Sequence, residues 1–485
     1  MNRTITKLQL GLLTAIAIFT ISCEREKLDE VMSKENLPPV SVALDQKVEV
    51  AGGNNFTLDN NQLTVPITIN FSGSTSRAFT VQMVGNTEII ASLIANNTLP
   101  AGTVALEPDT YDIPPVVNVP YGVTSVTWNL LLGRTFLEKN HGKDVALVVT
   151  MVDAAKGNSI TPGKNSIIVV VKTGETIALE DVHYITVGSK DGVVNIPFPF
   201  LPEKSGFSLS SQDMVIPLEL TLSGQAGPAF TVEAGKSAEI VNEAIASGKL
   251  TNVVPLPTAG WSIPYPKVGF EANRNTAPLD INVRLSSIIF STGKKFAIGV
   301  SLKNPSKYQL GKTNNNAIIV IDPDYFRKPF NAAPFVIKGT IGEASARIAA
   351  SNYDFGGQGI AFNDDGGRDG GPFRRPDNVD IADNQVTVGW CNSGEWLTYT
   401  VVVEEDGEYE FNAIIGAPGT NGRYSLFFGD ERVTGILSAK QTPGSYGDQQ
   451  PNLSTVNLKK GKHVMRFFMD VGAYDVQGYI FTRKK

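Results

Sequence analysis

Apolar residues recur along most of the chain with the two-residue period of β-strands. Residues 62–71 alternate between apolar and polar side chains, and residues 146–152 form a largely apolar run of strand length. Turns rich in Gly, Asn and Pro separate such segments, as in a sandwich of antiparallel sheets. Residues 89–94 depart from this period, because apolar residues there recur at spacings of three and four. This spacing predicts a short amphipathic helix within an otherwise all-β chain.

The first two thirds of the chain repeat one pattern with an offset of about 150 residues. Five segments of the first copy have counterparts in the second: Ile69–Gly73 and Leu220–Gly224, Ala78–Gln82 and Ala229–Glu233, Glu88–Ala95 and Glu239–Ala246, Tyr111–Pro114 and Trp261–Pro264, and Asn165–Val170 and Asn316–Ile321. We therefore predict two tandem immunoglobulin-like β-sandwiches with one short helix each, over residues 40–174 and 175–324.

Residues 387–401 contain two of the four tryptophans and carry the strongest candidate chemistry in the chain. A turn at residues 391–394 separates Trp390 from an alternating run that begins at Trp396. The alternation places Trp396 on one face of a strand and Leu397 on the other, and we expect Trp396 to be buried. Trp390 precedes the turn, near a sandwich edge where loops gather. Two roles stay open for it: a core residue, or a flat platform for the apolar face of a sugar ring.

The first residues carry the pattern of a bacterial lipoprotein signal. Arg3 and Lys7 precede a largely apolar run that ends just before Cys23, and an acidic run follows at once. We expect residues 1–22 to be a signal peptide, Cys23 to carry the lipid anchor, and residues 23–39 to form an acidic tether. The apolar run is too short to span a bilayer comfortably. A structural helix is the alternative interpretation.

Composition excludes several classes of function. Of the two cysteines, Cys23 is assigned to the lipid, so Cys391 has no partner and no disulfide is expected. The three histidines lie far apart in sequence, and together with so few cysteines they exclude a Cys/His zinc site. A net charge of -6 and a pI near 5.4 argue against nucleic acid as a partner. The length leaves room for about three domains of ~100–200 residues.

Residues 340–485 resemble the family 6 carbohydrate-binding modules. Five segments occur in the order found in that family: Ile348–Asp364, Gly370–Ile381, Gly389–Tyr399, Asp406–Tyr409 and Leu458–Phe467. The resemblance implies a jelly-roll β-sandwich that binds carbohydrate. Residues 325–339 are then a linker, and its aromatic residues suggest packing against a neighbour instead of a loose tether.

In that family, a sugar binds in a cleft at one loop end of the sandwich, between two aromatic rings. The resemblance places Trp390 in the first aromatic position and Tyr446 in the second, where tryptophan is usual. It assigns the polar residue that orients the sugar to Asp475 or Gln477, and a tail one residue longer than usual leaves this choice open. Glu395, beside the cleft segment, is a further candidate for a hydrogen bond to the sugar.

The resemblance also bears on calcium. The family often holds a structural calcium ion with two glutamates of its first strand, and here Ala349 and Ser351 stand at those positions. Because calcium needs hard oxygen ligands, we expect this site to be lost and no cofactor to be required. The acidic loop at residues 363–369 offers oxygens for calcium at a non-standard place, although a solvated turn is the simpler interpretation.

The two repeats are similar to domain of unknown function 1735, which is common at the N-terminus of Bacteroidota surface lipoproteins. No chemistry is attached to that family, so the repeats are expected to be spacers, with a second binding surface as the alternative. The acidic run after Cys23 resembles the surface-export signal of the same lipoproteins. These resemblances imply an outer-membrane location facing the cell exterior.

The sequence therefore predicts a non-catalytic, cell-surface lipoprotein that captures a polysaccharide or oligosaccharide. Its further partners are a membrane, through the lipid anchor, and a TonB-dependent transporter complex. Two alternatives stay open: a glycoside hydrolase, or an accessory subunit of one, with an appended binding module, and an adhesin or protein-binding subunit of a glycan-uptake complex. Glycosidases generally need two carboxylates about 5–10 Å apart on a scaffold that holds the substrate. No segment of the chain resembles such a catalytic domain.

Overall fold

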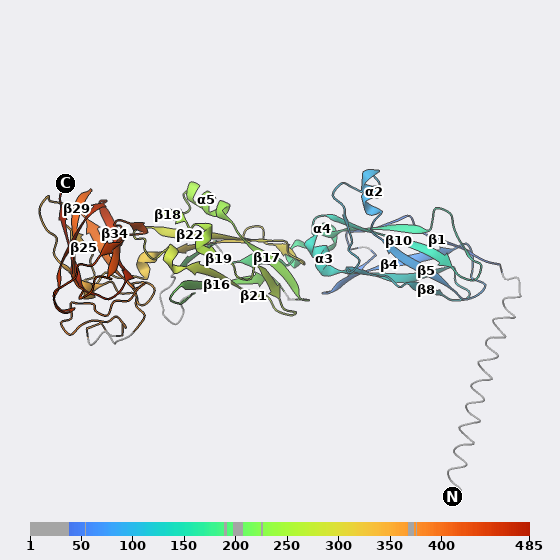
Figure 1. Ribbon diagram of the computed structural model, residues 1–485. Coiled ribbons are helices and arrows are strands. Elements are labelled where there is room, and N and C mark those ends of the chain that lie inside the picture. Colours follow the sequence, from blue (N-terminus) through green and yellow to red (C-terminus); the bar gives the residue numbers. More distant parts are fainter. Residues whose placement is uncertain are drawn as a thin grey trace, which may run out of the picture. The chain divides into compact units, whose positions relative to one another are not determined.

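The fold of the protein is all-β, as its hydrophobic pattern predicts (Figure 1). The computed structural model describes residues 38–53, 55–188, 192–196, 207–224, 227–366, 373–374 and 376–485. The predicted signal peptide and Cys23 lie outside the described residues. The chain divides into two compact units, the first comprising residues up to 184 with 307–309, and the second comprising residues 185–306 and 310–485. None of the helices in the described ranges combines the length and the apolar composition that a membrane span requires.

The first sandwich packs two sheets face to face. One sheet contains, in spatial order, β11 (Ser159–Ile160), β1 (Ser41–Leu44), β4 (Gln62–Phe71), β9 (Ser125–Gly133) and β7 (Tyr111–Asp112), with β3 (Thr57–Leu58) paired to β4. The other contains β2 (Lys47–Val50), β12 (Ser166–Lys172), β10 (Asp144–Ala154), β5 (Phe79–Asn86) and β8 (Val116–Val119), with β6 (Val104–Ala105) paired to β10. Alternate residues such as Leu63, Val65 and Ile67 fill the core between the sheets.

The second sandwich has the same topology, strand for strand. Its first sheet contains β23 (Gln309–Leu310), β13 (Tyr184–Val187), β16 (Asp213–Leu222), β21 (Thr276–Arg284) and β19 (Trp261–Ser262), with β15 (Ser208–Leu209) paired to β16. Its second contains β14 (Val193–Ile196), β24 (Asn316–Ile321), β22 (Lys295–Lys303), β17 (Phe230–Lys236) and β20 (Lys267–Phe270), with β18 (Val253–Pro255) paired to β22. The repeat seen in the sequence is therefore a repeat of the whole fold.

Each of these two sandwiches carries the predicted helix, α2 (Ile90–Ala95) in the first and α5 (Ala238–Ala246) in the second (Figure 1). Each helix buries its apolar side on a sheet, as Ile90 does against Val148 and Val241 does against Ile318. The first sandwich has two further short helices that the apolar spacing does not indicate, α3 (Arg134–Lys139) and α4 (Thr173–Thr176). The remaining helical turns are 3-10: η1 (Leu179–Asp181), η2 (Thr258–Gly260), η3 (Leu285–Ser287), η4 (Pro323–Tyr325) and η5 (Ala350–Asn352).

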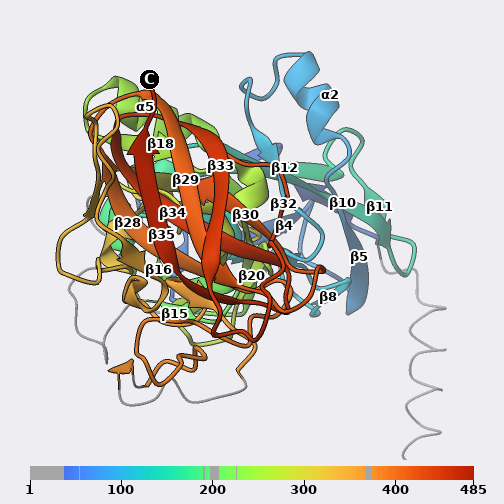
Figure 2. The ribbon, with the colours of Figure 1, turned by 60° about the vertical axis from the view of Figure 1, so that its left-hand side comes forward.

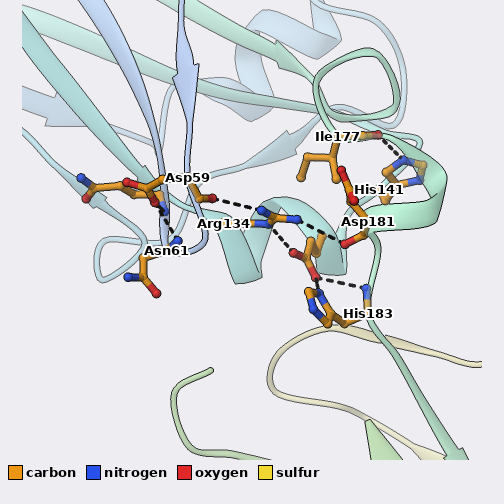
Figure 3. A network of polar contacts seen from close by, with 9 residues as sticks. Asp59, Asn61, Arg134, His141, Ile177, Asp181 and His183 are labelled. Carbon is orange, nitrogen blue, oxygen red and sulfur yellow. Dashed lines mark hydrogen bonds and ion pairs between the residues drawn. The ribbon is translucent and has the colours of Figure 1, made fainter. Parts of the chain in front are cut away.

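A buried carboxylate joins three segments of the first unit (Figure 3). Glu138 of α3 is 1% exposed. Its Oε1 accepts a hydrogen bond from Arg134 Nε at 2.7 Å, and its Oε2 lies 2.7 Å from His183 Nδ1. The guanidinium of Arg134 also donates to the carbonyl oxygens of Asp59 and Asp181, at 3.1 and 3.3 Å. Because a buried charge is stable only when it is paired, this network holds α3 against the segment that precedes β13.

Glu138→Gln is expected to lower the free energy of unfolding of the first unit by about 1–2 kcal/mol. The uncharged amide accepts through one oxygen only, so one of its two partners loses a charge-assisted hydrogen bond. Urea unfolding of the full chain measures this change, and Glu107→Gln, at an exposed position of the same sandwich, is the matched control. Equal midpoints for the two variants would show that the network contributes nothing to stability.

The third sandwich spans the C-terminal part of the second unit. One sheet contains β25 (Phe335–Ile337), β28 (Trp396–Val403), β34 (Gly461–Val471), β30 (Arg423–Phe428) and β31 (Glu431–Arg432), with β27 (Phe362–Asn363) paired to β28 and β32 (Leu437–Ser438) paired to β30. The other contains β26 (Ile348–Ala349), β35 (Asp475–Arg483), β29 (Gly407–Gly416) and β33 (Gln450–Leu458). Figure 2 shows β35, β29 and β33 side by side. Many residues of the core between the two sheets are aromatic, among them Tyr399, Phe411, Phe467 and Phe481.

The segment at residues 325–339 packs against the third sandwich, as its aromatic residues suggested. Phe330 stacks on Phe355, with ring centroids 5.8 Å apart. Arg327 is buried with its Nε 3.8 Å from a carboxylate oxygen of Asp354. The last residues of the segment form β25, which pairs in parallel with β28. The segment is therefore a structured part of the second unit.

Candidate functional site

A pocket with a volume of about 630 Å³ opens among the loops of the third sandwich. It is lined by Asp380, Trp390, Cys391, Asn392, Tyr446, Ala473, Tyr474 and Asp475. Three segments that are far apart in the sequence therefore meet here. Three of the five residues that the sequence nominates for sugar binding, Trp390, Tyr446 and Asp475, are among the lining residues.

Trp390 presents its ring to this pocket from an unusual backbone conformation. It is 50% exposed, so it is not a core residue. Its φ angle of 47° is in the left-handed region, which bulky residues rarely adopt unless the surrounding structure holds them there. The Oδ1 atom of Asp475 accepts a hydrogen bond from the Trp390 backbone N–H at 3.1 Å. Val388, two residues before Trp390, pairs with Val476 through two backbone hydrogen bonds of 2.8 and 2.9 Å. Trp390 is therefore anchored to the start of β35.

Tyr446 reaches the pocket from a loop that is packed against the end of β29. Its side chain is 44% exposed. The loop is held internally because Asp448 Oδ2 accepts from the Ser445 N–H at 2.9 Å. It approaches β29 closely at Gly416, where a Cβ atom would lie 2.0 Å from the Tyr446 carbonyl oxygen. A side chain at position 416 would therefore displace the second aromatic residue of the pocket.

The structure brings Asp475, and not Gln477, to the pocket. Gln477 is absent from the lining residues of the described chain, and its Oε1 accepts a hydrogen bond from Arg347 Nη1 at 3.0 Å. Burial raises the pKa of the Asp475 carboxyl to about 6, although the hydrogen bond from the Trp390 N–H opposes that shift. Asp475 thus supplies a polar group to the pocket and also supports the neighbouring aromatic platform.

Glu395 lies behind the pocket wall and is 4% exposed. Its two oxygens accept hydrogen bonds from the backbone N–H groups of Asn392, at 2.7 Å, and Asp365, at 3.2 Å. The Asn392 side chain in turn donates to the Asp365 carboxylate at 3.1 Å. Glu395 was expected to form a hydrogen bond to the sugar, but it is not among the described residues that line the pocket. Instead, it stabilises the turn that contains Asn392, and Asn392 lines the pocket.

Three carboxylates gather beside this turn. Asp364, Asp365 and Glu395 each offer an oxygen within 4.8 Å of the others. Burial, with a contribution from nearby carboxylates, raises the pKa of Asp364 to about 6 and that of Glu395 to about 7. Oxygen ligands of this kind are what calcium prefers. One oxygen of Asp364 accepts from the Gly366 N–H at 2.9 Å. Asp369, which the sequence analysis includes in the same loop, lies outside the described residues.

Removal of calcium is expected to change the melting temperature of the protein little. Ala349 lacks an oxygen in its side chain, and the Ser351 hydroxyl donates to the carbonyl of Gln385 at 2.8 Å. A bound ligand stabilises by RT ln(1 + [L]/Kd), so a thermal melt in chelator followed by a calcium titration measures any site directly. A calcium-dependent rise in the melting temperature that Glu395→Gln abolishes would contradict the expectation and place an ion at Asp364, Asp365 and Glu395.

The buried carboxyls also predict how stability depends on pH. Because the pKa values of Asp364, Glu395 and Asp475 are raised to about 6, 7 and 6, the folded chain keeps these protons at pH values where the unfolded chain has lost them. Their stabilising contribution is complete below about pH 4 and is lost as the pH rises through about 6–7. We expect unfolding midpoints in urea to be lower at about pH 8 than at about pH 5, and Glu395→Gln to reduce the difference. A midpoint that rises across this interval in wild type but not in Glu395→Gln would contradict the assignment.

Sequence reasoning missed several residues that line the pocket, including Asp380, Cys391 and Ala473. Ala473 has a φ angle of 73°, and its N–H donates to the Cys391 carbonyl at 3.1 Å. The sequence contains one indication of this contact. The segment that begins at Gly472 is one residue longer than in the family pattern, and this segment crosses the turn that follows Trp390. A Cβ at Gly472 would lie 2.1 Å from the same Cys391 carbonyl, so the close crossing requires glycine there.

Comparison with known proteins gives likenesses to solved structures only. Neither a protein-family model nor a curated protein sequence matches the chain. The chain is similar to the C-terminal family 6 carbohydrate-binding module of a marine laminarinase from Zobellia galactanivorans, with 19% identity over 29% of this chain and 100% of that chain, and a TM-score of 0.23. It is similar to a β-1,3-glucan-binding family 6 module from Bacillus halodurans, with 20% identity over 31% of this chain and 99% of that chain, and a TM-score of 0.22. It is also similar to a two-domain protein of unknown function from Bacteroides fragilis, with 8% identity over 62% of this chain and 95% of that chain, and a TM-score of 0.21. Identities and TM-scores this low assign no function to this chain.

Proposed function

We propose that the protein is a non-catalytic glycan-binding protein whose site is the pocket of Trp390, Tyr446 and Asp475. The observation that carries this proposal is the pairing of two half-exposed aromatic rings, from loops far apart in the sequence, at one pocket. Aromatic rings are normally buried, or exposed singly, so two exposed rings at one pocket indicate a ligand with flat apolar faces. The pocket volume of about 630 Å³ is in the range of small-ligand sites.

The polar residues of the pocket are suited to hydrogen bonds with the hydroxyl groups of a sugar. A sugar ring has an apolar C–H face for stacking and hydroxyl groups around its edge for hydrogen bonds. Asp475 and Asn392 offer a carboxylate and an amide beside the two rings. The segments that resemble family 6 carbohydrate-binding modules supply Trp390 and its turn, which supports the same proposal.

We further propose that the chain is a lipoprotein of the outer membrane that faces the cell exterior and is anchored through Cys23. The pattern that supports this is the basic start, the largely apolar run before Cys23 and the acidic run after it. In this proposal the two repeated sandwiches are spacers between the anchor and the third sandwich in the sequence, and a TonB-dependent transporter complex is a partner. Mass spectrometry of the membrane-extracted protein tests the anchor, since it should find a lipid-modified Cys23 and no peptide from residues 1–22. An unmodified N-terminus would refute it.

A glycan screen of the purified full chain tests the proposed function. Affinity gel electrophoresis on plant and algal polysaccharides should show retarded migration in at least one, and Trp390→Ala should remove the retardation. A reducing-end assay with the same polysaccharides tests the non-catalytic part of the proposal. Release of reducing ends by the pure protein would favour a glycoside hydrolase instead. Migration that is unaffected by every polysaccharide would favour the protein-binding alternative.

A further inference from the structure

The charge of the candidate pocket is one-sided. Asp380 and Asp475 both line it, and among the lining residues in the described chain there is no lysine or arginine. The two acids are linked through Gly389. Its N–H donates to the Asp380 carbonyl at 2.9 Å, and a Cβ there would lie 3.1 Å from the Asp475 carboxylate. Both acids therefore belong to the same wall of the pocket.

The ionisable groups near the Cys391 thiol behind this wall are also acids. The buried thiol of Cys391 has a raised pKa, first because of burial and then because of the negative charges of Asp475, Glu395 and Asp364. Burial also dominates the raised pKa of Asp475 itself. Carboxylates that are removed from water in this way are compensated best by a cation. With two acids and no lysine or arginine among its lining residues in the described chain, the pocket has a negative potential once Asp475 and Asp380 are ionised.

We propose that the pocket discriminates glycans by charge, binding an amino-substituted, cationic sugar most tightly, a neutral sugar less tightly, and a carboxylated or sulfated sugar least. This inference rests on the proposed function and names the substrate class of the same site. Asp475 is the specificity-determining residue, with the more deeply buried Asp380 behind it, because an anionic substituent beside Asp475 meets a like charge and an ammonium group meets an opposite one.

The aromatic residues act in the same direction. The faces of the Trp390 and Tyr446 rings carry negative electrostatic potential, so they attract an ammonium group that lies over them. A carboxylate or sulfate gains nothing from these faces. Cationic, neutral and anionic sugars can all stack their C–H face on these rings. The charge of the substituent is therefore the feature that distinguishes their affinities.

Four β-1,4-linked oligosaccharides of equal length provide the test, made of glucosamine, N-acetylglucosamine, glucose and mannuronic acid. Calorimetric titration of the full chain at about pH 7 keeps the uronate ionised and leaves Asp475, with its pKa of about 6, mostly ionised, and a negative site favours the protonated form of the amine. We expect the glucosamine oligomer to bind at least about tenfold more tightly than the mannuronate oligomer, with the two neutral oligomers between them. A tenfold difference is what one charge interaction over several ångströms gives in a partly solvated site.

Asp475→Asn identifies the source of the discrimination. The amide oxygen still accepts from the Trp390 N–H, so the platform keeps its support while the charge is lost. The variant should bring the affinities for the glucosamine and mannuronate oligomers closer together, whereas Glu431→Gln, which removes an exposed charge elsewhere on the third sandwich, should leave them apart. Mannuronate binding as tight as that of the neutral oligomers, or a separation unchanged in Asp475→Asn, would overturn the inference while leaving glycan binding intact. If none of the four binds and the polysaccharide screen is also negative, the proposed function fails and the inference fails with it.

Discussion

Trp396→Ala is expected to lower the free energy of unfolding of the second unit by about 3–5 kcal/mol, as the loss of a buried aromatic side chain does. Trp396 is 9% exposed, so the prediction that it is buried is confirmed. Its surroundings explain the size of the effect. The ring lies edge-to-face with Phe290 of the second sandwich, with centroids 5.3 Å apart. The guanidinium of Arg466 lies 3.8 Å from the centre of the Phe290 ring.

The Trp396 variant should leave the glycan site intact, because Trp396 is on the other side of the 391–394 turn and does not line the pocket. Urea unfolding of the full chain measures the loss of stability. Trp396→Phe, which keeps an aromatic ring against Phe290, is the matched control and should lose less. An unfolding midpoint like that of wild type would show that the contact between Trp396 and Phe290 does not stabilise the second unit.

Trp390→Ala is expected to have the opposite profile, with weakened binding and nearly unchanged stability. Removing a central aromatic contact from a binding site typically costs about 2–3 kcal/mol, or roughly a 30- to 150-fold rise in Kd. Because half of the Trp390 side chain is already exposed, little buried area is lost on truncation. Calorimetric titration with the polysaccharide found in the screen measures the first effect, and thermal melts measure the second.

The matched control for this variant is Tyr265→Ala, since Tyr265 is an aromatic residue of the second sandwich with 80% of its side chain exposed. It should bind as wild type does. If Trp390→Ala also binds as wild type does, the residue-by-residue assignment from the family resemblance is wrong, and the glycan contacts another surface of the protein.

Periodicity predicted those parts of the fold that depend on local alternation. Leu397, Tyr399 and Val401 share one face of β28, as the alternation predicts, and that face lies in the core of the third sandwich. The repeated segments predicted two sandwiches of the same kind, and their strand orders agree throughout. These features were accessible because each depends on residues that are neighbours in sequence or copies of one another.

Contacts between segments that are distant in the sequence could not be predicted from local patterns. The sequence predicts that Trp396 is buried but does not show that Phe290, about a hundred residues earlier, covers it. Likewise, it names Glu395 for the ligand, whereas the carboxylate is occupied by the backbone of Asn392 and of Asp365, thirty residues away. Asp380 was missed because no local pattern brings it next to Asp475.

The most direct test of the account is a crystal structure of the full chain with the oligosaccharide that the screen identifies. We expect one sugar ring to lie against Trp390 and Tyr446, with a hydroxyl or amino group in hydrogen-bonding distance of Asp475. A sugar bound elsewhere, with Trp390 and Tyr446 making no contact to it, would contradict the central claim.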